Sequence, residues 1–197
     1  MGTNLLNALI FITQTLIGLY LMFVLVRLLM QISRVDYYNP ISQGIIKITN
    51  PLCSPMRRFL PTLGRIDTAT LFLAIFLQLI IICLVMGLSG GLIFDVLYLP
   101  WALVGLAAAV CDIYFFALLI SVAVSWLAPQ SNHPAIILVN QLINPICEPA
   151  RKLIPPMGGL DFSIIVVFMA IYIIENFFLI KPLASSLGIP RGLILGL

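Results

Sequence analysis

One polar segment occurs twice in this chain. Residues 50–67 read NPLCSPMRRFLPTLGRID, and residues 144–161 read NPICEPARKLIPPMGGLD. The copies lie 94 residues apart, align without a gap and are identical at eight of 18 positions. Both begin with Asn-Pro, carry an arginine near the middle and end with aspartate. A segment that returns at a fixed spacing indicates that the chain is built from two related halves.

The rest of the chain is strongly apolar. Hydrophobic residues make up 62% and charged residues 9% of the sequence, whereas an ordinary soluble domain carries about 25% charged residues. Such a chain cannot cover a water-facing surface, so we expect it to lie in lipid. A membrane-spanning helix needs about 20 mostly apolar residues. Four segments meet this requirement: Leu5–Met30, Thr68–Leu88, Pro100–Trp126 and Phe162–Ile180.

The predicted fold class is an all-α membrane protein. The alternating ten-residue segments of a membrane barrel do not occur in the sequence. Each half contains two spans joined by the repeated segment, so the two halves are expected to be parallel tandem repeats of the form helix, interfacial helical loop, helix. We place the first repeat at residues 1–94 and the second at residues 95–197.

The distribution of basic residues predicts the orientation. The loop between the first two spans and the loop between the last two hold Arg34, Lys47, Arg57, Arg58, Arg65, Arg151 and Lys152. Asp95 is the only charged residue in the link between the second and third spans, and no basic residue precedes the first span. The positive-inside rule therefore predicts cytoplasmic repeated segments, with both termini outside the cell.

Each loop that contains a repeated segment has the signals of a structured loop. Asn39-Pro40 and His133-Pro134 are typical of a helix start, here an amphipathic helix lying along the membrane. We expect the following Asn-Pro pair to end this helix, a short turn to reach the next prolines, a glycine turn to follow, and aspartate to cap the next span. The residues concerned are Asn50, Pro51, Pro55, Pro61, Gly64 and Asp67, and in the second copy Asn144, Pro145, Pro149, Pro155, Gly158 and Asp161.

The basic pairs of the two copies have two interpretations. Arg57 with Arg58, and Arg151 with Lys152, could bind anionic lipid or a protein partner on the cytoplasmic face. Alternatively, they anchor the loop at the headgroups and offset the charge of the nearby aspartate.

Two carboxylates fall inside predicted spans. Asp112 lies near the middle of the third span, and Glu175 lies toward the outer end of the fourth. Carboxylates at such depths usually face a bundle interior or a water-filled cavity. They form a candidate proton or cation site, with Gln14 and Gln78 as possible helpers. The alternative is a neutral carboxyl group that is hydrogen-bonded to a neighbouring helix.

Other chemistry has little support in the sequence. Cys53, Cys83, Cys111 and Cys147 form no CxxC pair, and the single histidine, His133, occupies a helix-start position. No catalytic triad, P-loop or dinucleotide motif is present. We therefore predict neither an enzyme nor a bound metal or cofactor.

The second copy resembles the pattern of the YggT family, also called YlmG. Ser125-Trp126 precedes Asn144-Pro145, Pro149, Arg151-Lys152, Leu153-Ile154-Pro155-Pro156, Gly158-Gly159 and Asp161. The first copy departs from the pattern with Gln31-Ile32, Pro61-Thr62 and Gly64-Arg65. The resemblance implies a two-repeat bacterial integral membrane protein. Bacterial members are linked to osmotic and salt stress, cell division and nucleoid organisation, and a chloroplast relative to haem attachment.

Two functions remain open at this point. One is osmotic or envelope homeostasis through ion permeation, with four spans requiring a dimer. The other is a non-transporting inner-membrane scaffold for cell division, nucleoid organisation or assembly of a membrane complex. The expected partners are membrane lipids and either a second copy of the chain or an assembly partner, without direct nucleic-acid binding.

Overall fold

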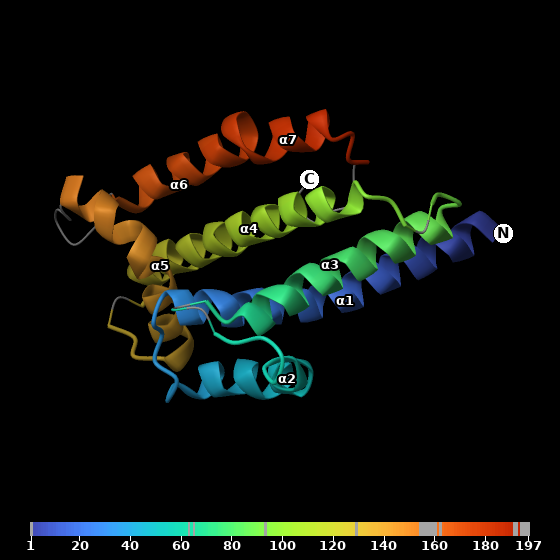
Figure 1. The fold of residues 1–197 in the computed structure, drawn as a ribbon. Helices are drawn as coiled ribbons and strands as arrows, with labels where there is room; N and C mark the ends of the chain where they lie inside the picture. The colour runs from blue at the N-terminus through green and yellow to red at the C-terminus, as the bar shows by residue number, and fades with distance from the viewer. Residues whose placement is uncertain are drawn as a thin grey trace.

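A computed structural model shows the chain as a set of long helices without an extended sheet in its described part (Figure 1). It describes residues 2–62, 64, 66–92, 94–128, 130–153, 161, 163–190 and 193. Pro155 and Gly158 of the second repeated segment lie outside these residues.

Four helical segments are long and apolar enough to cross a membrane, which confirms the predicted number of spans. They are α1 (Gly2–Ile32), α3 (Thr68–Leu88), α4 (Tyr98–Leu127) and a fourth segment over Ser163–Ser186. The fourth is interrupted: α6 (Ser163–Ile173) passes into a π-helical turn (Ile174–Phe178) and then α7 (Ile180–Ser186). The predicted end at Ile180 therefore falls six residues before the end of this segment at Ser186.

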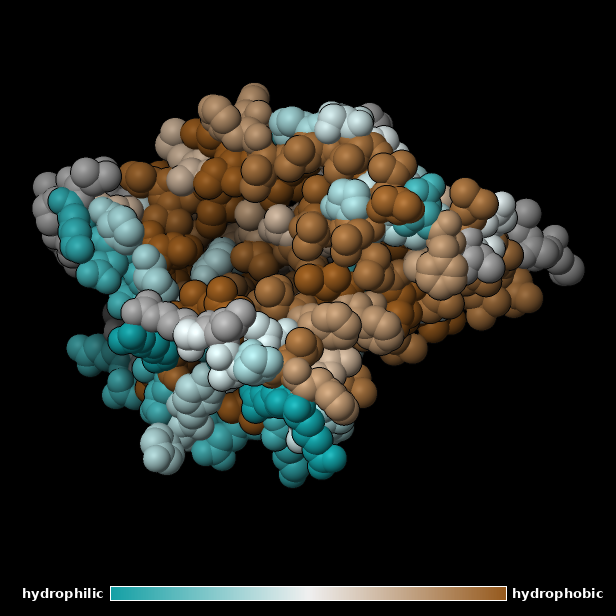
Figure 2. Space-filling view, in the orientation of Figure 1, coloured by the Kyte–Doolittle hydropathy of each residue, from teal (hydrophilic) through white to brown (hydrophobic). Residues whose placement is uncertain are grey.

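The spans alternate in direction, so each repeat is a helical hairpin. Figure 1 shows α1 and α4 running toward one end of the molecule, and α3 and α6 running back. The buried core between them is aliphatic and includes Val24, Leu25, Leu73, Ile82 and Leu118. Large apolar side chains cover the outside of the spans, and Figure 2 shows this brown surface with hydrophilic residues gathered at one end. The all-α fold of two parallel repeats is confirmed.

Two amphipathic helices lie at that hydrophilic end, and the first part of each repeated segment forms their last turns. They are α2 (Pro40–Met56) and α5 (Pro134–Leu153), and we call the pair the platform. Asn39 caps α2 by accepting a hydrogen bond from the Ile41 amide at 2.9 Å. His133 Nδ1 accepts from the Ala135 amide at 3.2 Å. Both predicted helix starts are confirmed.

The prediction that the Asn-Pro pairs end these helices is wrong. α2 continues through Pro51 and Pro55, and α5 continues through Pro145 and Pro149. Each proline removes one helical hydrogen bond, but the four-residue spacing puts both prolines of a copy on one face, and all four are exposed. The carbonyls without a partner can therefore be solvated. The axis of α2 turns along the helix, so that its last turns are seen end-on in Figure 1.

Hydrogen bonds join the platform across the two repeats. The Asn39 side chain donates to the Pro134 carbonyl at 2.7 Å, and Ser33 Oγ donates to the Leu142 carbonyl at 3.1 Å. The Asp36 amide donates to Gln141 Oε1 at 3.0 Å. Helices α2 and α5 also contact each other, so the platform lies on one face of the molecule, as expected for parallel repeats.

The platform and the link between α3 and α4 provide a test of orientation. Cys53 and Cys147 are fully buried and cannot report it, so the reporters are Tyr38→Cys and Val96→Cys in a cysteine-free background. Both positions are exposed, one next to the platform and one in the link. In right-side-out membrane vesicles, an impermeant maleimide should label Val96→Cys at once and Tyr38→Cys only after permeabilisation. The reverse pattern would contradict the positive-inside prediction.

Candidate functional site

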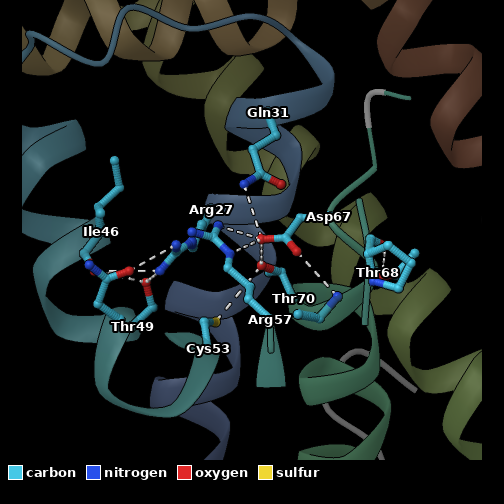
Figure 3. Close-up of polar contacts among 12 residues, drawn as sticks. Arg27, Gln31, Ile46, Thr49, Cys53, Arg57, Asp67, Thr68 and Thr70 are labelled. Carbon is cyan, nitrogen blue, oxygen red and sulfur yellow. Dashed lines mark hydrogen bonds and ion pairs between the residues drawn. The ribbon is translucent and has the colours of Figure 1, made fainter. Parts of the chain in front are cut away.

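The polar residues of the first repeat converge where α1, α2 and α3 meet (Figure 3). Asp67 is at the centre, and its side chain is 2% exposed. Its carboxylate accepts hydrogen bonds from Arg57 at 2.9 and 2.5 Å, from Thr70 Oγ1 at 2.8 Å and from Gln31 at 3.4 Å. It also accepts from the Ala69 amide at 3.2 Å, so the predicted N-cap of the second span is confirmed. We call this arrangement the first clasp.

Arg27 adds a second tie between α1 and α2. Its guanidinium donates to Thr49 Oγ1 at 2.6 Å and to Asn50 Oδ1 at 3.0 Å, and the residue is 2% exposed. Instead of extending to the headgroups, the arginine is buried beneath α2. Residue pattern alone missed this role, although Arg27 and Gln31 are four residues apart and therefore share a helix face directed at the platform.

The second repeat has a simpler clasp. Asp161 accepts a hydrogen bond from Arg151 Nε at 2.7 Å, from the Ser163 amide at 3.1 Å and from the Ser163 hydroxyl. Arg151 also donates to Asn144 Oδ1 at 2.7 Å. The predicted cap is again confirmed, but the position equivalent to Arg27 is Ser121, which donates to Asn140 at 3.1 Å.

The clasps separate the roles of the basic residues. Arg57 and Arg151 are paired with the aspartates ten residues later, as the interpretation of charge offset predicts. Arg58 is exposed and pairs with no described residue, and exposed Lys152 approaches Glu148 at 3.4 Å. Of the four residues in the two basic pairs, Arg58 and Lys152 are therefore the ones available to bind lipid or a partner.

The remaining motif residues shape the backbone around the first clasp. Gly64 has a φ of +61°, a left-handed conformation that glycine adopts at little cost. The Pro61 carbonyl accepts a hydrogen bond from Thr68 Oγ1 at 2.5 Å, which ties the turn to the start of α3. These residues set the backbone conformation between α2 and α3.

The electrostatics of the clasps follow from their geometry. Burial alone would raise the pKa of Asp67, but hydrogen bonds from Arg57, Thr70 and Gln31 and the charge of Arg57 lower it below its usual value. Burial would likewise raise the pKa of Asp161, and the contacts with Ser163 and Arg151 lower it. Both carboxylates are therefore stabilised in their ionised forms.

Asp112 faces a cavity of about 360 Å³ between α1, α3 and α4. Gln78 also lines this cavity, as predicted for a helper residue, together with Thr15. Most other lining side chains are apolar: Leu19, Leu21, Met22, Leu25, Ile113 and Phe116.

Glu175 and Gln14 are not among the residues that line this cavity. Glu175 lies in the π-helical turn, in the segment that follows α6. Gln14 donates to the Leu193 carbonyl at 3.5 Å. The structure thus brings Asp112 and Gln78 together, but not the whole predicted set. Among the described residues, no group of three His, Cys, Asp or Glu side chains could hold a metal ion.

Comparison with known proteins identifies the family. The model of the CCB3/YggT family matches residues 6–88 and 100–181, one segment in each repeat. Uncharacterized protein PA0392 of Pseudomonas aeruginosa is 43% identical over 191 residues, covering 95% of both chains. YggT of Escherichia coli K12 is 36% identical over 174 residues, covering 86% of this chain and 88% of its own. The chain therefore belongs to the CCB3/YggT family. No solved structure gives a significant match to it.

The two clasps allow a matched test of stability. Asp67→Asn keeps the cap but removes the charge that pairs with Arg57, so we expect it to lower the free energy of unfolding by about 1–3 kcal/mol. Asp161→Asn should have a smaller effect, because Asp161 is 21% exposed and accepts from fewer side chains. Thermal melting in detergent measures the stability of both variants. Equal losses of stability would contradict the conclusion that the first clasp is the stronger one.

The same clasp predicts the response to acid. A lowered pKa in the folded state means that the stabilisation is present above the unfolded pKa of about 4 and is lost as the pH falls through the folded value. The melting temperature of the native protein should therefore fall below about pH 4. The fall should be smaller in Asp67→Asn, which has no carboxylate to protonate at this position.

Proposed function

We propose that the protein is a non-enzymatic scaffold of the bacterial inner membrane that supports osmotic and envelope homeostasis. Its platform binds anionic headgroups on the cytoplasmic face and offers one rigid surface to a membrane assembly partner. The observation that carries this proposal is the set of hydrogen bonds from the α1–α2 connection to α5, donated by Ser33, Asp36 and Asn39, the last of which caps α2. An interaction surface that draws on both repeats explains why the segment is needed twice.

The charges of the platform suit an anionic membrane surface. Lys47, Arg58 and Lys152 are exposed, whereas Ile45 and Cys53 of α2 are buried against the spans. Each basic residue near an anionic leaflet contributes about 1 kcal/mol of attraction. Because Arg57 and Arg151 are held in the clasps, the exposed cations are the ones that can bind headgroups without loosening the fold.

A second candidate function is ion or proton permeation. It is favoured by Asp112 and Glu175, whose carboxyl groups both belong to segments that can span the membrane. Against it, the cavity at Asp112 offers a dehydrated cation few oxygen ligands, whereas selective pores surround the ion with rings of carbonyls or carboxylates. A permeation pathway would need further oxygen atoms from a second copy of the chain.

Lipid-dependent melting and ion flux separate the two candidates. Phosphatidylglycerol should stabilise the native protein more than phosphatidylcholine does, and the double variant Arg58→Gln with Lys152→Gln should lose most of this difference. Lys181→Gln is the control, since Lys181 lies in α7, away from the platform. Liposomes containing the native protein should show no ion flux above background.

The contrary results are equally distinct. Ion flux that disappears in Asp112→Asn would replace the scaffold with a transporter. If the double variant responds to phosphatidylglycerol as the native protein does, then Arg58 and Lys152 do not bind headgroups. Growth under salt stress then shows which site the physiological role requires, when the native gene is replaced by one variant at a time. If the protein is a scaffold, cells with the double variant should grow poorly and cells with Asp112→Asn should grow normally.

A further inference from the structure

The cavity between α1, α3 and α4 lies at the middle of the spans. Gln78 is the central residue of α3, Asp112 is at the centre of α4, and Gly18 is close to the centre of α1. Its volume of about 360 Å³ falls within the range of about 300–1,000 Å³ that is usual for small-molecule sites. Leu19, Met22 and Phe116 line it and are exposed on the surface of the spans, so it opens toward lipid.

The cavity is lined by one pair of equivalent positions from the two repeats. Gly18 is the repeat equivalent of Asp112, 94 residues earlier, and both residues line the cavity. Positions that correspond in the two repeats therefore face one space, and only one of them carries a side chain.

Gln78 is the second observation that points to a ligand. The residue is 4% exposed, lines the cavity, and forms no hydrogen bond with any residue that the structure describes. Asp112 likewise forms no hydrogen bond within the described part of the chain. Two unpaired polar groups thus line a space that is otherwise almost entirely apolar.

We infer that this cavity binds an uncharged, lipid-soluble molecule that carries a carbonyl group on an aromatic or quinone ring. The ring packs against Met22, Ile113 and Phe116, and the carbonyl oxygen accepts hydrogen bonds from the Gln78 amide and the Asp112 carboxyl group. The inference is independent of the proposed platform function.

The chemistry of the lining favours this class of ligand. An amide and an uncharged carboxyl group both donate hydrogen bonds, and a carbonyl oxygen has two lone pairs to accept them. Thr15 Oγ1 is occupied as a donor, because it donates to the Phe11 carbonyl at 2.7 Å. A hydrated cation would have to lose its water against apolar walls, whereas a ring with one polar atom suits a pocket with a few polar groups. The opening toward lipid provides the route of entry.

Benzophenone serves as a probe, because it is a lipid-soluble aromatic ketone that labels nearby C–H bonds when illuminated. In detergent it should raise the melting temperature of the native protein saturably, and illumination should concentrate the label on α1 around Met22. Gln78→Leu should weaken binding by roughly three- to tenfold, the range that one hydrogen bond supplies. Gln14→Leu makes the same change on α1 at a residue that does not line the cavity, and this variant should bind as the native protein does.

Asp112→Asn distinguishes the charge of the ligand. Asparagine still donates a hydrogen bond, so binding of benzophenone should survive this change, and Asp112→Leu should weaken it. Dodecylamine tests whether the cavity binds a cation instead. The proposed ligand class is wrong if the native protein binds dodecylamine but not benzophenone, and if Asp112→Asn abolishes the binding of dodecylamine.

The labelling experiment uses only the native protein, so its result does not depend on whether a variant folds. If the label were spread evenly over the lipid-facing surface of all the spans in the native protein, the proposal that this cavity is a binding site would be wrong. Equal affinity in Gln78→Leu and Gln14→Leu, with both folded by circular dichroism, would overturn the role of the amide.

Discussion

The carboxylate of Asp67 holds three helices together at one point. It caps α3, pairs with Arg57 just after α2 and accepts from Gln31 on α1. A charge that is 2% exposed is tolerated only when its partners compensate for the lost hydration, and here donors from all three segments do so. The position of the platform relative to the spans depends on this interaction, because α2 has no membrane-spanning segment of its own.

The two repeats use the same motif with different strength. In each, an arginine pairs with an aspartate ten residues later, and the asparagine of the Asn-Pro pair accepts from an arginine. In the first repeat that arginine is Arg27, buried on α1, whereas in the second it is Arg151 itself. The first repeat therefore attaches its platform helix to both spans, and the second attaches α5 mainly through the clasp and through the hydrogen bonds with the first repeat.

The sequence predicts the spans, the helix caps and the parallel arrangement because each depends on local pattern. Apolar length defines a span, a short polar side chain before it defines a cap, and an even number of spans per repeat sets the direction of the copies. The continuation of α2 through Pro51 could not be predicted in this way. It depends on which face the prolines occupy, and that is set by tertiary packing.

The candidate site shows the same limit. Polarity alone suggests Asp112 and Gln78. Only the packing of α1, α3 and α4 shows that these two residues line one cavity and that Glu175 and Gln14 do not. The role of Arg27 was hidden because its partners, Thr49 and Asn50, approach it only when α2 folds back over α1.

Hydrogen exchange of the α2 amides tests most directly whether the buried carboxylate fixes the platform. In the native protein in nanodiscs, the amides of α2 and of the first turn of α3 should be protected. Asp67→Ala should remove much of this protection, while the amides in the middle of α4 remain protected and show that the spans are intact. Unchanged protection of α2 in Asp67→Ala would contradict the account, because the platform would then be held by apolar packing alone.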